Sequence, residues 1–373
     1  MLRERARIIR QVRSFFDTRG YLELDTPLLS PDLIPESCLE VFETNLIRPS
    51  GEKKPYWLIP SPEIWMKKII AAHRVSVYQI CKCFRNGEST GFLHSPEFTM
   101  LEYYTMDAGY EDSLKITEDL FAFLSQGSGI RDQGSGVDVR KHSGLVTRTD
   151  NEQNPQSLIP IPHSPFLIPH SSLLTPFTRL TIAEAFARYA NFDLFAAAEK
   201  PGGLEAEARR LGLEPPACLK HQAGRETAAL YDLIFIHAVE PHLRQERPVA
   251  LLDYPAFVPT LARQGPVGKT GGGKTVERWE LYFDGIELAN CFTEETDAQR
   301  VRDFFESEAA AKERHALVRH NIDRNYWKHF LPQQTHGGKP FPRCSGVALG
   351  LDRLIMALCG KSTIDSVLPF PME

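Results

Sequence analysis

Residues 77–104 read VYQICKCFRNGESTGFLHSPEFTMLEYY, and this stretch decides the fold. Two runs rich in β-forming residues flank a polar loop, which predicts paired strands over Val77–Phe84 and Phe98–Tyr104. Because side chains alternate between the two faces of a strand, one face collects Phe98, Met100, Glu102 and Tyr104. A ring, a carboxylate and a phenol side by side favour a small-molecule site. The alternative is an amphipathic hairpin with one face in water.

The surrounding sequence supplies further strands and helices. Other strand-like runs lie at Tyr21–Asp25, Leu251–Tyr254 and Trp279–Phe283. Helix-like stretches lie at residues 2–18, Ser113–Leu124, Ile182–Tyr189, Thr227–Val239 and Asp297–His320. The strands follow one another as hairpin-like neighbours and not in a repeating βαβ series. We therefore expect an α+β fold, with a mainly antiparallel sheet flanked by helices.

Near the C-terminus, residues 344–358 read CSGVALGLDRLIMAL and predict a strand that passes at Gly350 into a helix. Gly346 and Gly350 allow another group to approach the backbone closely. Arg353 falls in the first turn of this helix, beside an N-terminus that favours anions. The alternative is an ordinary strand-to-helix turn with a surface arginine.

Residues 280–294, ELYFDGIELANCFTE, are expected to place acids on one strand and on the turn after it. The polar residues concerned are Glu280, Glu287, Asn290 and Glu294. Neighbouring carboxylates repel one another unless a cation or a substrate amine neutralises them, and their oxygens are ligands that Mg²⁺ prefers. Solvated acids on an edge strand remain the alternative.

The overall composition is typical of a soluble globular protein, and the cysteines favour a cytoplasmic one. Among 373 residues, 42% are hydrophobic and 24% charged, and the net charge of −5 argues against a general nucleic-acid coat or a membrane-surface protein. The sequence contains neither a signal-peptide core nor a stretch long enough to span a bilayer. Seven cysteines without a CxxC pair favour reduced thiols. For Cys81 and Cys83, on one face of a strand, we favour packing over metal binding.

Two segments break the pattern. Residues 126–178 are rich in Gly, Ser, Pro and Asn, which predicts a flexible insertion. Residues 268–275, GKTGGGKT, satisfy the P-loop pattern, but that motif needs a helix after it, to whose N-terminus the phosphates bind. Here Val276–Phe283 alternates like a strand, so we interpret 264–275 as a flexible loop, with an active-site lid left open.

Taken together and in this order, these segments resemble the three signature motifs of class II aminoacyl-tRNA synthetases. Motif one is RGYLELDTPLL with Pro27, motif two is CFRNGE…HSPEF, and motif three is GVALGLDRL. The segments SPEIWMKK at 61–68 and ELANCFTEETDAQR are similar to the lysine-specific branch. The resemblance covers most of the chain outside 126–178.

A narrower likeness is to the elongation factor P lysine ligases, synthetase paralogues that attach (R)-β-lysine to a lysine side chain of elongation factor P. The chain begins at motif one, so we expect one catalytic domain over residues 1–373 without an anticodon-binding OB-fold. It also carries Ala348 where the synthetases usually have Gly, a change that the resemblance links to β-lysine. Two alternatives stay open: a tRNA-charging enzyme without its own anticodon domain, and an idle paralogue. Elongation factor P is favoured over tRNA as the acceptor, no membrane partner is expected, and motif one implies a homodimer.

The resemblance implies ATP and Mg²⁺ as cofactors and an aminoacyl adenylate as intermediate. It assigns the catalytic roles to Arg85 and Arg353, and Mg²⁺ binding to Glu280 and Glu287. ATP would contact Arg85, Asn86, Glu88, His94, Ser95, Phe98, Glu287, Leu288, Gly350 and Arg353. The amino acid would contact Ser61, Pro62, Glu63, Tyr104, Asn290, Glu294 and Ala348. Three positions depart from the family: Gly87 precedes the acid, Ser95 replaces Asn, and Cys291 replaces Gly, where it either crowds the site or packs.

Overall fold

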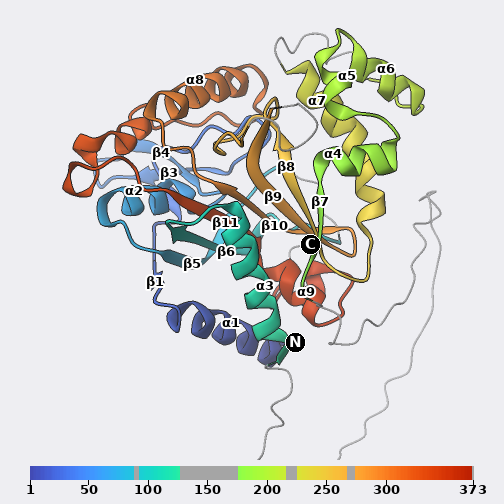
Figure 1. Ribbon diagram of the computed structural model, residues 1–373. Coiled ribbons are helices and arrows are strands. Elements are labelled where there is room, and N and C mark those ends of the chain that lie inside the picture. Colours follow the sequence, from blue (N-terminus) through green and yellow to red (C-terminus); the bar gives the residue numbers. More distant parts are fainter. Residues whose placement is uncertain (88–91, 127–174, 216–224, 267–273, 372–373) are drawn as a thin grey trace, which may run out of the picture.

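A twisted eight-stranded sheet forms the centre of the molecule (Figure 1). The computed structural model describes residues 1–87, 92–126, 175–215, 225–266 and 274–371. The spatial order of the strands is β1-β5-β6-β11-β10-β9-β8-β7. Their bounds are β1 Leu22–Glu23, β5 Val77–Phe84, β6 Glu97–Met106, β7 Thr178–Thr181, β8 Val249–Pro255, β9 Thr275–Phe283, β10 Ile286–Thr293 and β11 Cys344–Gly350. Only the outer pairs β1–β5 and β7–β8 are parallel, so the mainly antiparallel sheet is confirmed.

Helices surround this sheet. They are α1 Leu2–Asp17, α2 Glu63–His73, α3 Tyr110–Gln126, α4 Ile182–Ala185, α5 Leu194–Glu199, α6 Gly203–Arg210, α7 Glu226–Ile234, α8 Ala298–His315 and α9 Leu351–Leu358. A small second sheet has the order β2-β4-β3, with β2 Leu29–Ser30, β3 Glu43–Ile47 and β4 Lys53–Leu58. No helix in the described part of the chain is long and apolar enough to cross a membrane.

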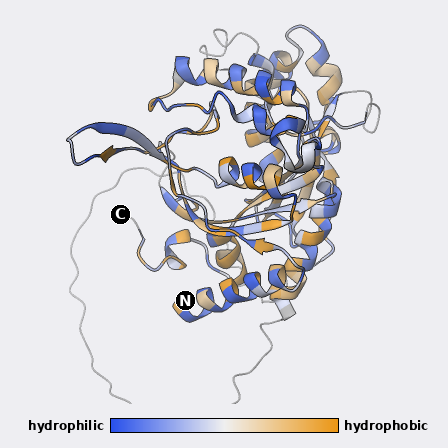
Figure 2. Cartoon of the chain, turned by 90° about the vertical axis from the view of Figure 1, so that its left-hand side faces the viewer, coloured by the Kyte–Doolittle hydropathy of each residue, from blue (hydrophilic) through white to orange (hydrophobic). Residues whose placement is uncertain are grey.

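Helices α1, α3 and α9 pack on one face of the sheet, around its largest apolar core. Helix α1 is amphipathic, and Figure 2 shows both hydrophilic (blue) and hydrophobic (orange) residues along this helix, which starts at the N mark. Its apolar side reaches the core through Phe15 and Phe16, which are fully buried. Strand β6 contributes Leu101 and Tyr103 to the same core. The alternate residues of β6 therefore point to the opposite face of the sheet.

A separate lobe of helices α4 to α7 packs on strands β7 to β9 around a core of its own. Helix α4 begins with a capping box, in which Thr181 and Glu184 satisfy each other's backbone amides. The predicted helices at 182–189 and 227–239 both form, and each ends in a π-helical turn, Phe186–Ala190 and Phe235–Val239. This lobe lies at one end of the site described below.

Three expectations concern loops and helix ends. Lys274 is followed directly by strand β9, so the P-loop interpretation is excluded by the missing helix. Residues 267–273 of that loop and 127–174 of the expected insertion lie outside the described residues. The helix predicted to run to His320 ends at His315.

Candidate active site

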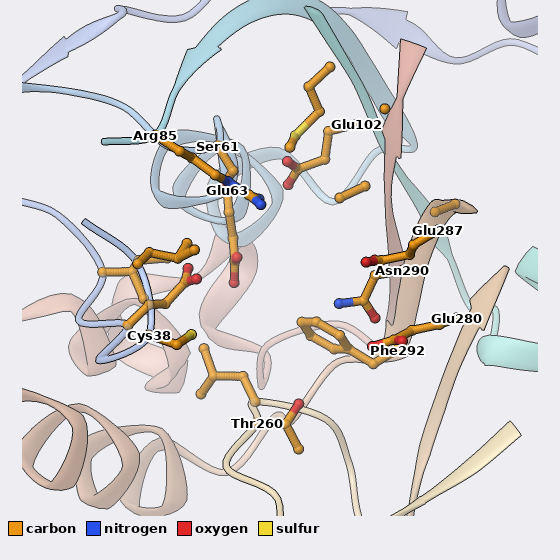
Figure 3. A pocket seen from close by; sticks show the side chains of 18 of the residues that line it. Cys38, Ser61, Glu63, Arg85, Glu102, Thr260, Glu280, Glu287, Asn290 and Phe292 are labelled. Atoms are coloured by element: carbon orange, nitrogen blue, oxygen red, sulfur yellow. The ribbon is translucent and has the colours of Figure 1, made fainter. Parts of the chain in front are cut away.

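A cavity of about 770 Å³ lies on the face of the sheet opposite α1, α3 and α9. Figure 3 shows side chains from several elements pointing into it. Its walls come from β6, β10 and β11, from the start of α2, from the loop around Cys38 and from helices α7 and α8. Most of the predicted site residues line it: Ser61, Glu63, Arg85, His94, Ser95, Phe98, Tyr104, Glu280, Glu287, Leu288, Asn290, Ala348, Gly350 and Arg353. The alternation predicted for β6 is confirmed, since Phe98, Met100, Glu102 and Tyr104 line the cavity together.

Four side chains form what we call the acidic pocket: Glu63, Glu102 and Tyr104, which line the cavity, and Glu294, which does not line it but lies against Gly346 of its wall. The Tyr104 hydroxyl donates to Oε1 of Glu102 at 2.7 Å. Glu294 comes close because strand β11 has Gly346 here. A Cβ atom on this glycine would lie 2.5 Å from Cε1 of Tyr104 and 3.0 Å from Oε1 of Glu294. Only glycine leaves room for both groups.

The carboxylates of this pocket retain unused hydrogen-bonding capacity. Glu102 is 2% exposed and Glu294 is 1% exposed. Within the described structure, Oε2 of Glu102 and Oε1 of Glu294 have no hydrogen-bond partner. Buried polar atoms normally have one, so an unpaired pair of carboxylate oxygens indicates a place for a donor that arrives from outside.

Lys67 is the fixed cation of the acidic pocket, and the sequence analysis did not assign it a role. Its Nζ lies 2.7 Å from Oε2 of Glu294 and also pairs with Glu63, one turn earlier on α2. The i,i+4 spacing of Glu63 and Lys67 was the available signal. Glu102 was placed on the correct face but was also missing from the predicted substrate-binding residues.

Burial controls the charge of the acidic pocket. It raises the pKa of Glu102 well above its usual range, and it raises that of Glu294 to about 8 although Lys67 opposes the shift. For Lys67 burial lowers the pKa, but Glu294 and Glu63 outweigh it and hold the pKa well above its usual value. The ammonium therefore stays charged, and Glu294 titrates at about pH 8 in the empty pocket.

Arg85 and Arg353, the two arginines predicted from the sequence, both line the cavity. The Arg85 guanidinium lies 5.3 Å from the ring centroid of Phe98. Arg353 donates from Nη1 to the backbone oxygen of Glu287 at 2.9 Å and from Nε to that of Leu93 at 3.2 Å. The Ser95 hydroxyl is buried and has no hydrogen-bond partner in the described residues. Two guanidinium groups facing one cavity favour a polyanionic ligand such as a nucleoside triphosphate.

The position of Arg353 depends on its neighbour Asp352. This carboxylate pairs with Arg5 of α1 at 2.5 Å and accepts the backbone amide of Thr99 at 2.6 Å. Both Arg5 and Asp352 are buried, so the start of α9 is fixed against α1 and β6. The residue after it is thereby directed into the cavity.

The acids near the arginines are arranged differently from the sequence expectation. Glu280 lies on β9 and Glu287 on β10, so they face the cavity from two strands of a hairpin and not from one strand and its turn. Oε1 of Glu280 accepts from Arg278 at 2.5 Å and Oε2 from Tyr282 at 2.8 Å. Burial and Glu280 raise the pKa of Glu287 to about 7, while Arg353 opposes the shift.

This pair of carboxylates fits Mg²⁺, which binds proteins through one or two carboxylates and completes its shell with water and substrate phosphates. Among the described residues there is no group of three His, Cys, Asp or Glu side chains placed to hold a metal. A metal bound here would take most of its ligands from water and substrate.

Three of the predicted site residues in the described structure do not line the cavity: Asn86, Pro62 and Glu294. Asn86 binds the neighbouring loop, with its backbone amide on the Glu40 carbonyl at 2.9 Å and its side chain on the Val41 carbonyl at 3.3 Å. Pro62 precedes the first residue of α2. Glu88 lies outside the described residues.

The cysteines of strands β5 and β10 pack against neighbouring side chains. Cys291 is fully buried in the main core, so it packs and does not crowd the cavity. The sulfur of Cys83 lies 3.8 Å from that of Cys81 and 4.0 Å from that of Met100. The six cysteines of the described residues are free thiols.

Comparison with known proteins agrees with this geometry. Residues 1–373 match the family described as tRNA synthetases class II (D, K and N). The chain is 32% identical over 373 residues to the elongation factor P–(R)-β-lysine ligase of Avibacterium paragallinarum, covering 100% of this chain and 95% of that protein. It is 31% identical to the proteins of the same name from Hamiltonella defensa, over 100% and 95% of the two chains, and Yersinia enterocolitica, over 100% and 94%.

Proposed function

Because the chain belongs to the class II tRNA synthetases of the D, K and N type, we propose that it is an ATP-dependent ligase acting on elongation factor P. It activates lysine or (R)-β-lysine as an aminoacyl adenylate and transfers it to a lysine side chain of that factor. The names of the relatives support this acceptor. One observation carries the proposal: buried oxygens of Glu102 and Glu294 have no hydrogen-bond partner in the described residues, and the cavity that Glu102 lines is also lined by Arg85 and Arg353. A substrate amine would donate to the carboxylate oxygens, and the triphosphate would bind the two arginines.

In the first step, a carboxylate oxygen of the amino acid attacks the α-phosphorus of ATP, and the bond to pyrophosphate breaks. Arg85 would neutralise the α-phosphate and Arg353 the γ-phosphate, with Phe98 stacked on the adenine. Glu280 and Glu287 would hold Mg²⁺, which would supply further charge neutralisation. These groups lower the barrier by position and charge, and no protein nucleophile is required.

In the second step, the neutral ε-amine of the acceptor lysine attacks the adenylate carbonyl. The new C–N bond replaces the bond to AMP, and the amine loses a proton. The acidic pocket holds the side-chain amine of the activated amino acid during this exchange, because an analogue without that amine leaves buried carboxylates unpaired.

We assign the choice between lysine and β-lysine to Ala348, which lines the cavity. Ala348 of β11 is paired with Glu102 on one side and Asn290 on the other. Its methyl group therefore lies between two residues that would contact the amino acid. Charging of tRNA is the less favoured alternative. A homodimer and a cytoplasmic location belong to the same proposal.

Amino-acid-dependent exchange between ATP and pyrophosphate tests the first step. Exchange with lysine or (R)-β-lysine, and its absence with norleucine, which lacks the terminal amine, is expected. An enzyme that exchanges with no diamino acid would be the idle paralogue.

A further inference from the structure

We propose that Lys67 is a positioning residue that fixes the charge of the acidic pocket, so that the pocket accepts two ammonium groups from one amino acid. This inference rests on the proposed function, because it explains how the pocket selects a diamino acid. Lys67 is placed to act through Glu63 and Glu294 and need not touch the reacting atoms.

The geometry sets Lys67 apart from an ordinary surface lysine. It is 1% exposed, and lysine is almost never so deeply buried unless it is paired. Its ammonium bridges Glu63 on its own helix and Glu294 after β10. It also lies 5.0 Å from the ring centroid of Phe292, which lines the cavity. Glu63 and Glu294 each contact the Lys67 ammonium through a single carboxylate oxygen. The second oxygen of Glu294 is therefore left for another donor.

A charge count follows from these contacts. Glu63, Glu102 and Glu294 supply three negative charges when ionised, and Lys67 supplies one positive charge. The filled pocket therefore lacks two positive charges, which is the number of amino groups on lysine or β-lysine. An amino acid with one amine leaves a buried carboxylate without a counter-charge, which is costly in a site of low dielectric constant.

Lys67 also controls when the pocket can bind. With this ammonium in place the pKa of Glu294 is about 8, and without it burial would raise that pKa further. The groups that face Lys67 or its carboxylate partners from the surrounding elements are Glu63 on α2, Glu102 and Tyr104 on β6, Glu294 and Glu295 after β10, Tyr326 between α8 and β11, and Cys344 on β11. Binding of a diamino acid should therefore expel protons from the pocket.

The test replaces Lys67 by methionine, which has similar length and no charge. The matched control is Lys68→Met, because Lys68 is the next residue and pairs with a single carboxylate, Asp323, at 2.5 Å outside the cavity. For K67M we expect the KM of the diamino acid in pyrophosphate exchange to rise about tenfold or more with a smaller change in kcat. The acid limb of kcat/KM should move upward by about one pH unit.

Calorimetry measures proton release on binding, which would stay unchanged if Lys67 only stabilised the fold. Lysine binding at about pH 8, where Glu294 of the wild type is half protonated, should release more protons from K67M than from the wild type or K68M when measured in buffers of different ionisation enthalpy. An unchanged KM, acid limb and proton count in K67M would overturn the inference. Wild-type protein inactive with every diamino acid would instead refute the proposed function.

A second variant covers the case in which K67M does not fold. The double change K67M/E294Q removes both members of the buried ion pair, which proteins tolerate better than the loss of one member. The double variant keeps the wild-type deficit of two positive charges, because Glu63 and Glu102 remain and Lys67 is gone, whereas E294Q alone has a deficit of one. We therefore expect K67M/E294Q to fold and to prefer lysine over norleucine more strongly than E294Q does. A double variant whose preference does not exceed that of E294Q would overturn the inference.

Discussion

Glu102→Gln separates recognition of the amine from stability of the fold. The change keeps the size of the side chain and the oxygen that accepts from the Tyr104 hydroxyl. In the wild type this hydroxyl lies 2.7 Å from Oε1. It replaces the unpaired oxygen by an NH₂ group, which cannot accept a hydrogen bond from an ammonium. A hydrogen bond to a charged group contributes about 1.5–3 kcal/mol. At about 1.4 kcal/mol for each tenfold change, the KM for lysine or β-lysine should rise roughly 10- to 150-fold.

Stability should change far less. Burial already raises the pKa of Glu102 well above its usual range, so the empty pocket holds a neutral acid that a neutral amide resembles. We expect the midpoint of thermal unfolding to shift by less than about 3 °C. The matched control is Glu97→Gln on the same strand, where an exposed pair with Lys82 at 3.1 Å contributes about 0–1 kcal/mol. Pyrophosphate exchange and calorimetric unfolding measure both effects. An E102Q enzyme with the wild-type KM for both diamino acids would refute this account of the pocket.

Four further predictions concern the site and the assembly. The free energy of unfolding of the ligand-free protein should fall as pH rises from about 5 to about 8. The pKa values of Glu287, about 7, and Glu294, about 8, exceed the usual 4.5, so the folded state holds protons in this range that the unfolded state has lost. A melting temperature that stays constant over this range would contradict the prediction. Arg353→Met should raise the KM for ATP about 10- to 100-fold in exchange assays, with incomplete recovery in Arg353→Lys; an unchanged KM would remove this arginine from the phosphate site. Ala348→Gly should shift the kcat/KM ratio toward lysine and away from β-lysine; an unchanged ratio would sink the assignment. Light scattering should detect a dimer, whereas a monomer at every concentration would contradict the interface expected from motif one.

The central sheet was largely predictable from the sequence. Val77–Phe84 and the segment that forms β6 are runs rich in β-forming residues, and the glycine before α9 marks the change from strand to helix. Faces follow from the period of two, which is why the sequence alone predicts that Glu102 and Tyr104 lie side by side. The hairpin β3–β4 was missed because all residues of β3 are exposed, so no apolar periodicity marks it.

Tertiary contacts decided what the sequence pattern could not. Helix α8 ends early, and the backbone amides of Leu317 and Val318 then donate to the Glu40 carboxylate at 2.9 Å each. Lys67 pairs with Glu294, which is far away along the chain. Neither contact leaves a local signal, because charged residues at such separations meet only after the sheet has formed. The predicted roles of the site residues remain predictions, although their convergence on one cavity supports them.

Acceptor choice is the most direct test of the proposed ligase. The protein is incubated with ATP, Mg²⁺ and labelled lysine or (R)-β-lysine in the presence of both elongation factor P and total tRNA. We predict label on elongation factor P in a hydroxylamine-stable amide, lost when its acceptor lysine is replaced by arginine. Label that appears on tRNA and leaves elongation factor P unmodified would contradict the account.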